Sequence, residues 1–377
     1  MKIAFLANHN VIHTVRWANS MALRGHEVTV YSLHRHLQDG LAPGVKKIQL
    51  PFPPNWGYYA NMPYLRFCLR KFKPDILNAH YASGYGTLGR LSGFHPYVLS
   101  VWGSDVYDFP GQSPLKHKLL IKNLSSADLI CSTSRAMAVQ TRKVCPTLDE
   151  IAITPFGVDT VKFCPARREA GSTIIIGTVK KLEYKYGIDT LIRAFAHLRD
   201  TLRQRRSDQA ERLRLLIVGG GSDDAALRRL AREADVDKVT SFRGVAPHDQ
   251  IPAYLNEMDI YVALSRLDSE SFGVAILEAS ACGLPVVVSD ADGPAEVVLD
   301  NETGLIVPRE NVSAAAAALE RLVLDVDLRE QLGRSGRIHV EAKYTWGHCV
   351  DIMENAFRQK AKGQRPLTCS TFDSPID

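Results

Sequence analysis

The feature that most constrains this chain is a regular alternation of short apolar runs with helical patterns. The runs contain few polar residues, as do strands whose two faces are both buried. Strands of this kind, separated by helices, are typical of a parallel sheet that helices cover on both sides. In the first series, the predicted strands span residues 2–8, 26–33, 75–80, 97–103, 128–134 and 150–157. The pattern in the first part of the chain therefore predicts a doubly wound α/β domain.

A second series of the same kind follows a break in the pattern. The break is PARREAGS, residues 165–172, whose proline, glycine and charges are typical of an interdomain linker. The strands predicted beyond it span 172–179, 212–221, 239–244, 259–264, 285–290 and 304–308. The helices predicted with them span 188–202, 223–234, 314–325 and 346–360.

The two series predict an α/β architecture of two doubly wound, Rossmann-like domains. We expect an N-terminal domain at 1–165, a second domain at 166–345, a helix at 346–362 that crosses back to the first domain, and a disordered tail at 363–377. A length of 377 residues suits two domains of ordinary size. Ligands of such sheets bind beyond the carboxyl ends of the strands, so two facing domains would form a binding cleft.

Composition places the chain among globular proteins, with 45% hydrophobic and 23% charged residues. No run approaches the ~18 apolar residues of a membrane span. The N-terminal MKIAFLANHN lacks the apolar length and cleavage site of a signal peptide, so we expect a cytoplasmic protein. The seven cysteines are scattered and form no Cys-x-x-Cys pair, which argues against a disulfide framework and against a zinc site.

The charge is uneven along the chain. Residues 1–165 contain 18 Lys and Arg against 9 Asp and Glu, whereas the remainder contains 28 against 32. A basic first half suits an anionic membrane surface or an acidic substrate, although ordinary solvated charge would give the same count. The basic stretches 66–73 and 115–122 have the pattern of helix faces, which disfavours nucleic acid as a partner.

The stretch ESFGVAILE at 270–278 places two carboxylates at the edges of an apolar segment. Positions eight apart on a helix are about 80° out of line, so one amphipathic stripe does not explain both acids. A helix that begins at about Gly273 leaves Glu270 in the preceding loop and Glu278 on the helix. The backbone N–H groups of Ser271, Phe272, Gly273 and Val274 would then face a ligand, and such a helix N-terminus attracts phosphate.

Three further loops follow strands of the second series. Lys180, Lys181 and Lys185 lie in the loop 177–187, where they could neutralise a pyrophosphate or could simply be solvated. The turn 219–224 begins Gly-x-Gly but has Asp224 where a dinucleotide fingerprint needs its third glycine, which disfavours a nicotinamide dehydrogenase. Turn geometry and a nearby ligand both remain possible reasons for Gly219. In SDADG, residues 289–293, turn chemistry explains the Asp-x-Asp pattern as well as a metal would.

Polar and aromatic side chains also follow the strands of the first series. His13, His80, Trp102 and Asp105 are all expected in loops at one edge of the predicted sheet. Each of them alone is explained by capping or packing, but their shared edge makes them candidates for a site. The chain contains no Gly-x-Ser-x-Gly turn, so a hydrolase triad has no basis.

The segment 265–298, SRLDSESFGVAILEASACGLPVVVSDADGPAEVV, resembles the donor-binding signature of retaining, GT-B-fold glycosyltransferases of family 4, the glycosyl transferases group 1. Those proteins carry Glu-x7-Glu, a small-residue helix, Gly-x-Pro-Val-Val and a final Glu-Val-Val. Glu270, Glu278 and Glu296 match the three acids. Further matches occur at 24–32, 156–165, 215–221, 242–265 and 344–357, so the resemblance covers nearly the whole chain apart from the tail.

The resemblance implies a nucleotide-sugar site in the second domain. Glu278 would hold the ribose hydroxyls and Glu270 the hydroxyls of the donor sugar, with Glu270 also a catalytic candidate. Arg243, Gly244 and Val245 would meet the base, and the 177–187 lysines would hold the pyrophosphate. Gly219 is a further donor-binding candidate. No metal or other cofactor is then required. Transfer is expected to retain the anomeric configuration, with the leaving phosphate helping to deprotonate the acceptor.

Three departures from the family pattern affect the remaining assignments. The loop after the first strand is Asn8-His9-Asn10 in place of a glycine pair, and we place Asn8, His13 and Trp102 on the acceptor side. Trp102 stands where members often have a histidine, so Asp105 and His80 become the catalytic candidates of this domain. Lysines replace the family's Arg-x4-Lys pair. The strand alignment favours Lys181 as the counterpart of the arginine, whereas the five-residue separation favours Lys180 with Lys185 as the pair.

The sequence thus predicts a metal-independent hexosyltransferase that uses a nucleotide diphosphate sugar and a glycan or lipid-linked acceptor. We expect it in the cytoplasm, peripheral on the inner membrane face, in the biosynthesis of envelope polysaccharide or lipopolysaccharide. One alternative is a nucleotide-sugar epimerase or hydrolase of the same fold, which would need no acceptor. The other is a non-catalytic subunit that binds nucleotide sugars without turnover.

Overall fold

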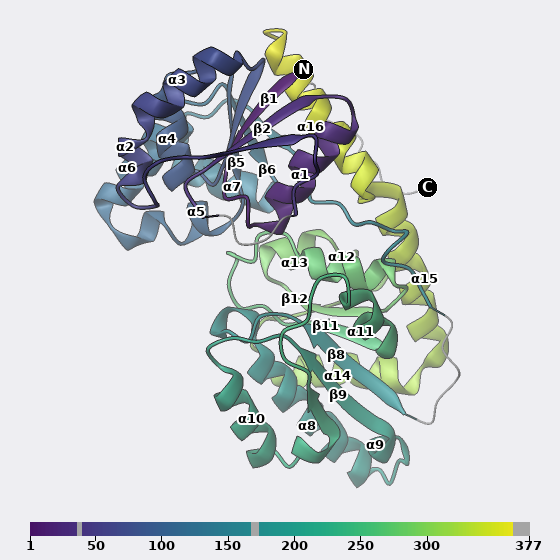
Figure 1. The fold of residues 1–377 in the computed structure, drawn as a ribbon. Coiled ribbons are helices and arrows are strands. Elements are labelled where there is room, and N and C mark those ends of the chain that lie inside the picture. The colour runs from purple at the N-terminus through teal and green to yellow at the C-terminus, as the bar shows by residue number, and fades with distance from the viewer. Residues whose placement is uncertain (36–39, 167–172, 365–377) are drawn as a thin grey trace. The chain divides into compact units, whose positions relative to one another are not determined.

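The structure, a computed structural model, describes residues 1–35, 40–166 and 173–364. Most of the predicted linker 165–172 and most of the predicted tail 363–377 therefore lie outside the described residues. The chain divides into two compact units (Figure 1). The N-terminal unit comprises Met1–Phe156 together with Gly347–Asp377, and the second unit comprises Gly157–Trp346.

The N-terminal unit is built on a seven-stranded parallel sheet with the order β3-β2-β1-β4-β5-β6-β7. Its strands are β1 Lys2–Leu6, β2 Glu27–Ser32, β3 Val45–Gln49, β4 Ile76–His80, β5 Tyr97–Val101, β6 Leu129–Ser132 and β7 Ile151–Ile153. Its helices are α1 Ile12–Leu23, α2 Gly57–Ala60, α3 Met62–Phe72, α4 Gly84–Ser92, α5 Ser104–Tyr107, η1 Pro110–Gln112, α6 Pro114–Leu124, α7 Arg135–Val144 and α16 Trp346–Ala361. The strand order reverses between β1 and β4, where doubly wound sheets bind ligands.

Local sequence explains how several of these helices begin and end. Ser113 accepts a hydrogen bond from the Lys116 N–H at the start of α6, and Ser134 accepts one from the Met137 N–H at the start of α7. These are N-caps, which satisfy backbone donors that a helix leaves unpaired. Gly25 follows α1 with a φ of +81°, a conformation that glycine adopts without strain.

The C-terminal helix α16 joins the N-terminal unit through a buried charge cluster. The Glu354 carboxylate accepts hydrogen bonds from Arg24 Nη1 at 2.7 Å and from Arg358, and it lies 3.0 Å from His26 Nε2. Burial acts to raise the pKa of Glu354, but these donors outweigh it and lower the pKa to about 2. Glu354 is therefore ionised at neutral pH.

The second unit contains a six-stranded parallel sheet with the order β10-β9-β8-β11-β12-β13. Its strands are β8 Ile174–Val179, β9 Leu213–Val218, β10 Thr240–Phe242, β11 Ile260–Ala263, β12 Val286–Ser289 and β13 Gly304–Val307. Its helices are η2 Tyr184–Tyr186, α8 Ile188–Gln204, α9 Gln209–Arg212, α10 Asp224–Glu233, η3 Asp237–Val239, α11 Ile251–Glu257, α12 Val274–Ala281, α13 Asp292–Glu296, α14 Val312–Leu324 and α15 Val326–Lys343. The prediction of two doubly wound parallel α/β domains is confirmed.

Several local predictions were incomplete or wrong. The edge strand β3 was missed because its lysines are exposed and only Val45 in it is fully buried. The helix α15 was missed because two of its five buried residues, Gly333 and Gly336, carry no apolar side chain that would mark its buried face; a Cβ on Gly333 would lie 2.1 Å from the Gly283 carbonyl oxygen. His13 lies in the first turn of α1, His80 ends β4 and Asp105 lies in α5, so three of the four residues expected in loops belong to regular elements. Within the described residues, the structure contains no helix long and apolar enough to span a bilayer.

Candidate functional site

An ion pair lies at the carboxyl edge of the second unit's sheet. Lys180 directly follows β8, and Glu270 lies in the loop before α12, which begins after Gly273 as the sequence predicts. Lys180 Nζ is 2.6 Å from Glu270 Oε1, and the two side chains are only 7% and 14% exposed. Two segments distant in sequence thus meet beside the N-terminus of α12, where charged ligands of such sheets bind.

The charge state of Glu270 follows from its surroundings. Burial acts to raise the pKa of the carboxyl group, but the nearby charge of Lys180, its hydrogen bond and the more distant charge of Lys185 outweigh burial, so the pKa lies below its ordinary range. Glu270 is therefore an ionised acceptor, able to bind hydroxyl groups such as those of a sugar.

The three lysines of the 177–187 loop occupy different environments. Lys181 is 70% exposed and lies 3.7 Å from Glu183, so it is a solvated surface cation. The Lys185 backbone carbonyl accepts a hydrogen bond from the Arg266 N–H at 2.8 Å. The Arg266 side chain binds Asp189 and Glu310 and lies over the Tyr184 ring, which fixes the loop that carries Lys185. Of the three lysines, Lys180 is thus the one with a buried side chain and Lys181 the one with an exposed side chain.

Glu278 pairs with a histidine that the sequence did not single out. The carboxylate is buried on α12, and its Oε1 atom lies 2.8 Å from His248 Nε2. The His248 ring is also 5.5 Å from the Phe163 ring. His248 lies in the loop between β10 and α11, four residues after Gly244, and a single histidine in a loop carries no pattern that marks it. Only its position within the matched block 242–265 could have indicated it.

The glycine turn after β9 is explained by close backbone packing. Gly219 has a φ of +144°, and a Cβ on it would lie 1.8 Å from the Lys180 carbonyl oxygen. Its N–H group donates to the Gly244 carbonyl at 2.8 Å, which ties the turn to the loop 243–245. In that loop, Arg243 is exposed and Val245 is 81% exposed. The loop therefore presents free side-chain surface beside the rigid turn.

Gly293 is a second residue that the sequence reasoning missed. A Cβ on it would lie 2.2 Å from the Glu270 carbonyl oxygen and 2.4 Å from the Phe272 nitrogen. The loop that carries Glu270 therefore rests directly on the backbone of α13. A glycine inside SDADG is ordinarily attributed to the turn itself, so this contact could not be expected from local sequence.

The first acid of the Asp-x-Asp pattern in SDADG, Asp290, binds an arginine. Asp290 accepts from both the backbone N–H and Nε of Arg309, and Asp268 accepts from Arg309 Nη1 at 3.0 Å and from the Asp292 N–H. Turn and loop chemistry thus accounts for these aspartates. No group of three or more His, Cys, Asp or Glu side chains suited to a metal occurs among residues 1–35, 40–166 and 173–364.

In the N-terminal unit, His80 and Trp102 pack together at the carboxyl edge of the sheet. Their ring centroids are 4.3 Å apart, and His80 Nδ1 lies 3.0 Å from Thr14 Oγ1. The His80 side chain is fully buried, and its burial lowers the pKa to about 3, with a smaller effect of His13. His80 is therefore a neutral imidazole at physiological pH. His13 stacks on Phe156 with ring centroids 4.0 Å apart.

Asp105 and Asn8 shape the backbone around this cluster. Asp105 is buried and accepts hydrogen bonds from the N–H groups of Ala82, Trp102 and Gly103 at 2.7, 3.1 and 2.9 Å. Burial raises the pKa of Asp105, although these bonds act against the shift. Asn8 accepts from the Asn10 N–H at 3.0 Å within the loop after β1. Both side chains thus hold loops at the edge where an acceptor site was predicted.

The family models and the curated relatives that match this chain describe glycosyltransferases. Residues 164–339 match the family model described as glycosyl transferases group 1, and residues 2–134 match the model described as glycosyl transferase 4-like. The chain is 34% identical over 206 residues to the GDP-mannose-dependent alpha-(1-6)-phosphatidylinositol monomannoside mannosyltransferase of Mycobacterium tuberculosis, a match covering 51% of each chain. It thus spans about half the length of this curated relative.

A longer match supports the same family. The protein of the same name from Mycolicibacterium smegmatis is 30% identical over 277 residues, 69% of each chain. Among solved structures, sucrose-phosphate synthase of Thermosynechococcus elongatus superposes with a TM-score of 0.80 at 21% identity, covering 97% of this chain and 100% of that one. That likeness shows the shared fold of two Rossmann-like domains. The chain belongs to the glycosyl transferases group 1 family of GT-B-fold glycosyltransferases.

Proposed function

We propose that this protein transfers a hexose from a nucleoside diphosphate sugar to a lipid-linked or glycan acceptor. The observation that carries the proposal is the largely buried Lys180–Glu270 pair beside the N-terminus of α12. Its carboxylate can accept sugar hydroxyls while its ammonium, with Lys185, faces the phosphates. The family membership of the chain supports the same reading.

The other candidate residues have complementary roles in this proposal. Glu278 binds the ribose hydroxyls, and His248 orients its carboxylate from 2.8 Å. Arg243, Gly244 and Val245 contact the base. The backbone around Ser271 to Val274 presents the helix N-terminus to phosphate and sugar oxygens. The glycine turn at Gly219 holds the loop that carries Lys180 in register with the base-binding loop.

Charge stabilisation is the main catalytic contribution in this scheme. The bond between the anomeric carbon and the phosphate oxygen breaks, and the nucleoside diphosphate leaves with the bonding electrons. Lys180 and Lys185 stabilise the charge that develops on it, which preorganised cations do effectively in a site of low polarity. The acceptor hydroxyl attacks the same face and gives its proton to the leaving phosphate, so the configuration is retained. The lysines then supply the positive charge that other transferases take from a metal.

The names of the relatives guide the choice of substrates. The mycobacterial proteins are named as GDP-mannose-dependent enzymes that act on a phosphatidylinositol mannoside. We therefore propose GDP-mannose as the first donor to test and a phosphoinositol lipid as the first acceptor. Envelope polysaccharide or lipopolysaccharide assembly, in the cytoplasm and at the inner membrane face, stays a prediction. His80, Asp105, Asn8, His13 and Trp102 would lie on the acceptor side.

A donor panel tests the proposal directly. The purified protein is incubated with UDP-, GDP- and ADP-sugars, with and without lipid acceptors, and the products are analysed. We expect glycolipid formation that Glu270→Ala abolishes and that the exposed control Glu233→Ala leaves intact. Sugar released or isomerised without an acceptor would favour the hydrolase or epimerase. Donor binding without any turnover would favour the non-catalytic subunit, and unchanged turnover in Glu270→Ala would contradict the site.

A further inference from the structure

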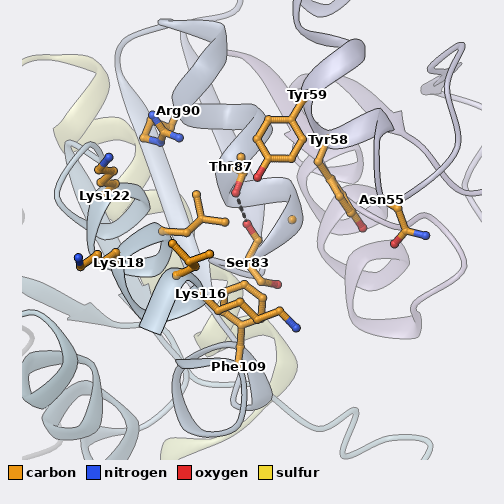
Figure 2. Close-up of a pocket in the computed structure, with 13 residues that line it drawn as sticks. Asn55, Tyr58, Tyr59, Ser83, Thr87, Arg90, Phe109, Lys116, Lys118 and Lys122 are labelled. Carbon is orange, nitrogen blue, oxygen red and sulfur yellow. Dashed lines mark hydrogen bonds between the residues drawn. The ribbon is translucent and has the colours of Figure 1, made fainter. Parts of the chain in front are cut away.

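A cavity of about 730 Å³ lies in the N-terminal unit, lined by residues of α2, α4 and α6 and of the segments beside them (Figure 2). Arg90, Lys118 and Lys122 lie along one side of it, and Tyr58 and Tyr59 on the other. The complete lining is Asn55, Tyr58, Tyr59, Ser83, Gly84, Thr87, Arg90, Phe109, Leu115, Lys116, Lys118, Leu119 and Lys122. None of these residues has a role in the proposed donor site.

The lining is strongly cationic. It contains Arg90, Lys116, Lys118 and Lys122, and among the described residues that line it there is no acid. Lys118 and Lys122 are one helical turn apart on α6, where like charges destabilise a helix. Both are exposed, and neither makes a hydrogen bond or an ion pair with any residue in the described ranges. Their charge is therefore available to an anion.

The floor of the cavity is rigid and polar. Thr87 Oγ1 donates to the Ser83 carbonyl at 2.7 Å, and Asn123, which is fully buried, donates to the Ala82 carbonyl and to Thr87 Oγ1, each at 2.8 Å. Asn123 also accepts from Arg90 Nε at 2.9 Å, which holds the guanidinium at the cavity wall. The arginine is thus fixed in place, whereas a solvated surface arginine would move freely.

The rim of the cavity is apolar and exposed. Leu115 is 78% exposed and Tyr59 is 48% exposed, and Trp56, in the same short segment as Tyr58 and Tyr59, is 85% exposed. Large apolar side chains that face water beside a group of cations are typical of a protein surface that meets a lipid bilayer. A soluble anion would need the cations but would not need this rim.

We propose that this cavity binds the phosphate-bearing headgroup of a membrane lipid and so holds the acceptor of the proposed transfer. The inference rests on the proposed function for the identity of that lipid as acceptor. Ser83 follows His80 by three residues, so part of the cavity lining lies close to the carboxyl end of β4, where the acceptor-side candidate His80 lies. The cations bind the phosphate, and Leu115, Trp56 and Tyr59 enter the interfacial layer of the bilayer.

Vesicle binding tests the headgroup site without any donor. The full chain is sedimented with phosphatidylcholine vesicles that contain or lack phosphatidylinositol. We expect binding only to the anionic vesicles, and Lys118→Ala/Lys122→Ala should weaken it by about tenfold or more. The control Arg142→Ala/Lys143→Ala removes the same charge from exposed positions on α7 and should change binding by less than about threefold. Equal losses in the two variants would overturn the proposal, because general attraction to the membrane would then suffice.

Competition separates the cavity from the membrane charge. Soluble glycerophosphoinositol should release the wild-type protein from the vesicles if the cavity recognises a headgroup. Retention of the protein on the vesicles at saturating competitor would contradict the proposal. Binding of the free headgroup without any vesicle binding would also contradict it, since the site would then serve a soluble phosphate ester.

Turnover distinguishes failure of this inference from failure of the proposed function. With a lipid acceptor, Lys118→Ala/Lys122→Ala should raise the KM for the lipid by about tenfold and leave kcat and donor binding near the wild-type values. If the wild type transfers sugar to the lipid and the variant is unaffected, the cavity is not the acceptor site. If no acceptor is glycosylated but vesicle binding still depends on Lys118 and Lys122, the headgroup site stands and the proposed function fails.

Discussion

Lys180 and Glu270 are separated by ninety residues in the chain, but the Nζ and Oε1 atoms lie 2.6 Å apart with both side chains largely buried. A buried pair of this kind contributes little net stability, because desolvation of the two charges offsets their attraction. Its position beside the N-terminus of α12, at the carboxyl edge of the sheet, is better explained by a role in ligand binding, because ligands of such sheets bind there.

Removing one member of the pair should cost stability as well as activity. Lys180→Met leaves the Glu270 carboxylate buried without its partner, and we expect a loss of about 3–5 kcal/mol in the free energy of unfolding. Turnover should fall by about 10²–10³-fold, because one group that stabilises the developing phosphate charge is lost. Urea denaturation and steady-state kinetics measure the two effects. The exposed control Lys181→Met should lie within about 0.5 kcal/mol of the wild type.

The double variant separates the two effects. Lys180→Met/Glu270→Gln removes both charges, so most of the lost stability should return while turnover stays at the level of the single variant. A double variant that regains activity together with stability would show that the pair is structural and would contradict its catalytic role.

Much of the second unit could be predicted from local sequence. The start of α12 after Gly273, with Glu270 in the loop and Glu278 on the helix, follows from helical geometry and from glycine's tolerance of its φ of +96°. By contrast, β3 and α15 escaped prediction because their burial depends on neighbours that the local pattern does not contain. VKKIQ looks polar until β2 covers one edge, and Gly333 and Gly336 of α15 indicate close packing only once Gly283 and Thr303 lie against them.

The residues missed at the candidate site share one cause. His248 meets Glu278 across thirty positions, and Gly293 is required by the backbone of Glu270 and Phe272 in a different loop. Such contacts depend on tertiary approach, which neither periodicity nor spacing encodes. The sequence could not distinguish the environments of the three lysines for the same reason: only the fold reveals that the Lys180 side chain is buried and that of Lys181 is exposed.

Glu278 and His248 should affect donor binding more than turnover. In Glu278→Gln the side chain becomes a weaker hydrogen-bond acceptor for the ribose hydroxyls. It also loses the charged hydrogen bond to His248, and a bond of this kind contributes about 1.5–3 kcal/mol. We expect the Kd for the nucleotide, measured by calorimetry, to rise by about tenfold or more, with kcat changed by less than about threefold. His248→Asn should give a smaller change in the same direction. A kcat that falls in parallel with the affinity would place Glu278 in the chemical step instead.

Gly293 provides a test of how tightly the Glu270 loop is held. In Gly293→Ala the new methyl group overlaps the Glu270 carbonyl, so the loop must move or the protein must lose about 1–3 kcal/mol of stability. We expect a lower melting temperature and reduced donor affinity, both measured in one thermal-shift titration. Gly44→Ala is the matched control, because a Cβ on Gly44 would have no heavy atom within 4 Å and the φ of Gly44 is not positive. A fully stable and active Gly293→Ala would mean that the loop is loosely packed.

Buried neutral histidines predict how stability depends on pH. The pKa of His80 is lowered from 6.5 to about 3 in the folded state, so between these values the unfolded chain binds a proton that the folded chain does not. The free energy of unfolding should therefore be highest above pH 7 and should fall as the pH is lowered, with His80 alone accounting for about 2 kcal/mol at pH 5. His339, whose pKa is lowered by burial to about 4, acts in the same direction.

A substitution isolates the contribution of His80. His80→Asn has no group that titrates in this range, so its unfolding free energy, measured in urea at a series of pH values, should fall less steeply between pH 7 and pH 4. The slope is compared with that of the exposed control His197→Gln, which should follow the wild type. If His80→Asn kept the full wild-type slope, His80 would have to be protonated in the folded state, and its fully buried neutral imidazole beside Trp102 would be the wrong description of this edge of the sheet.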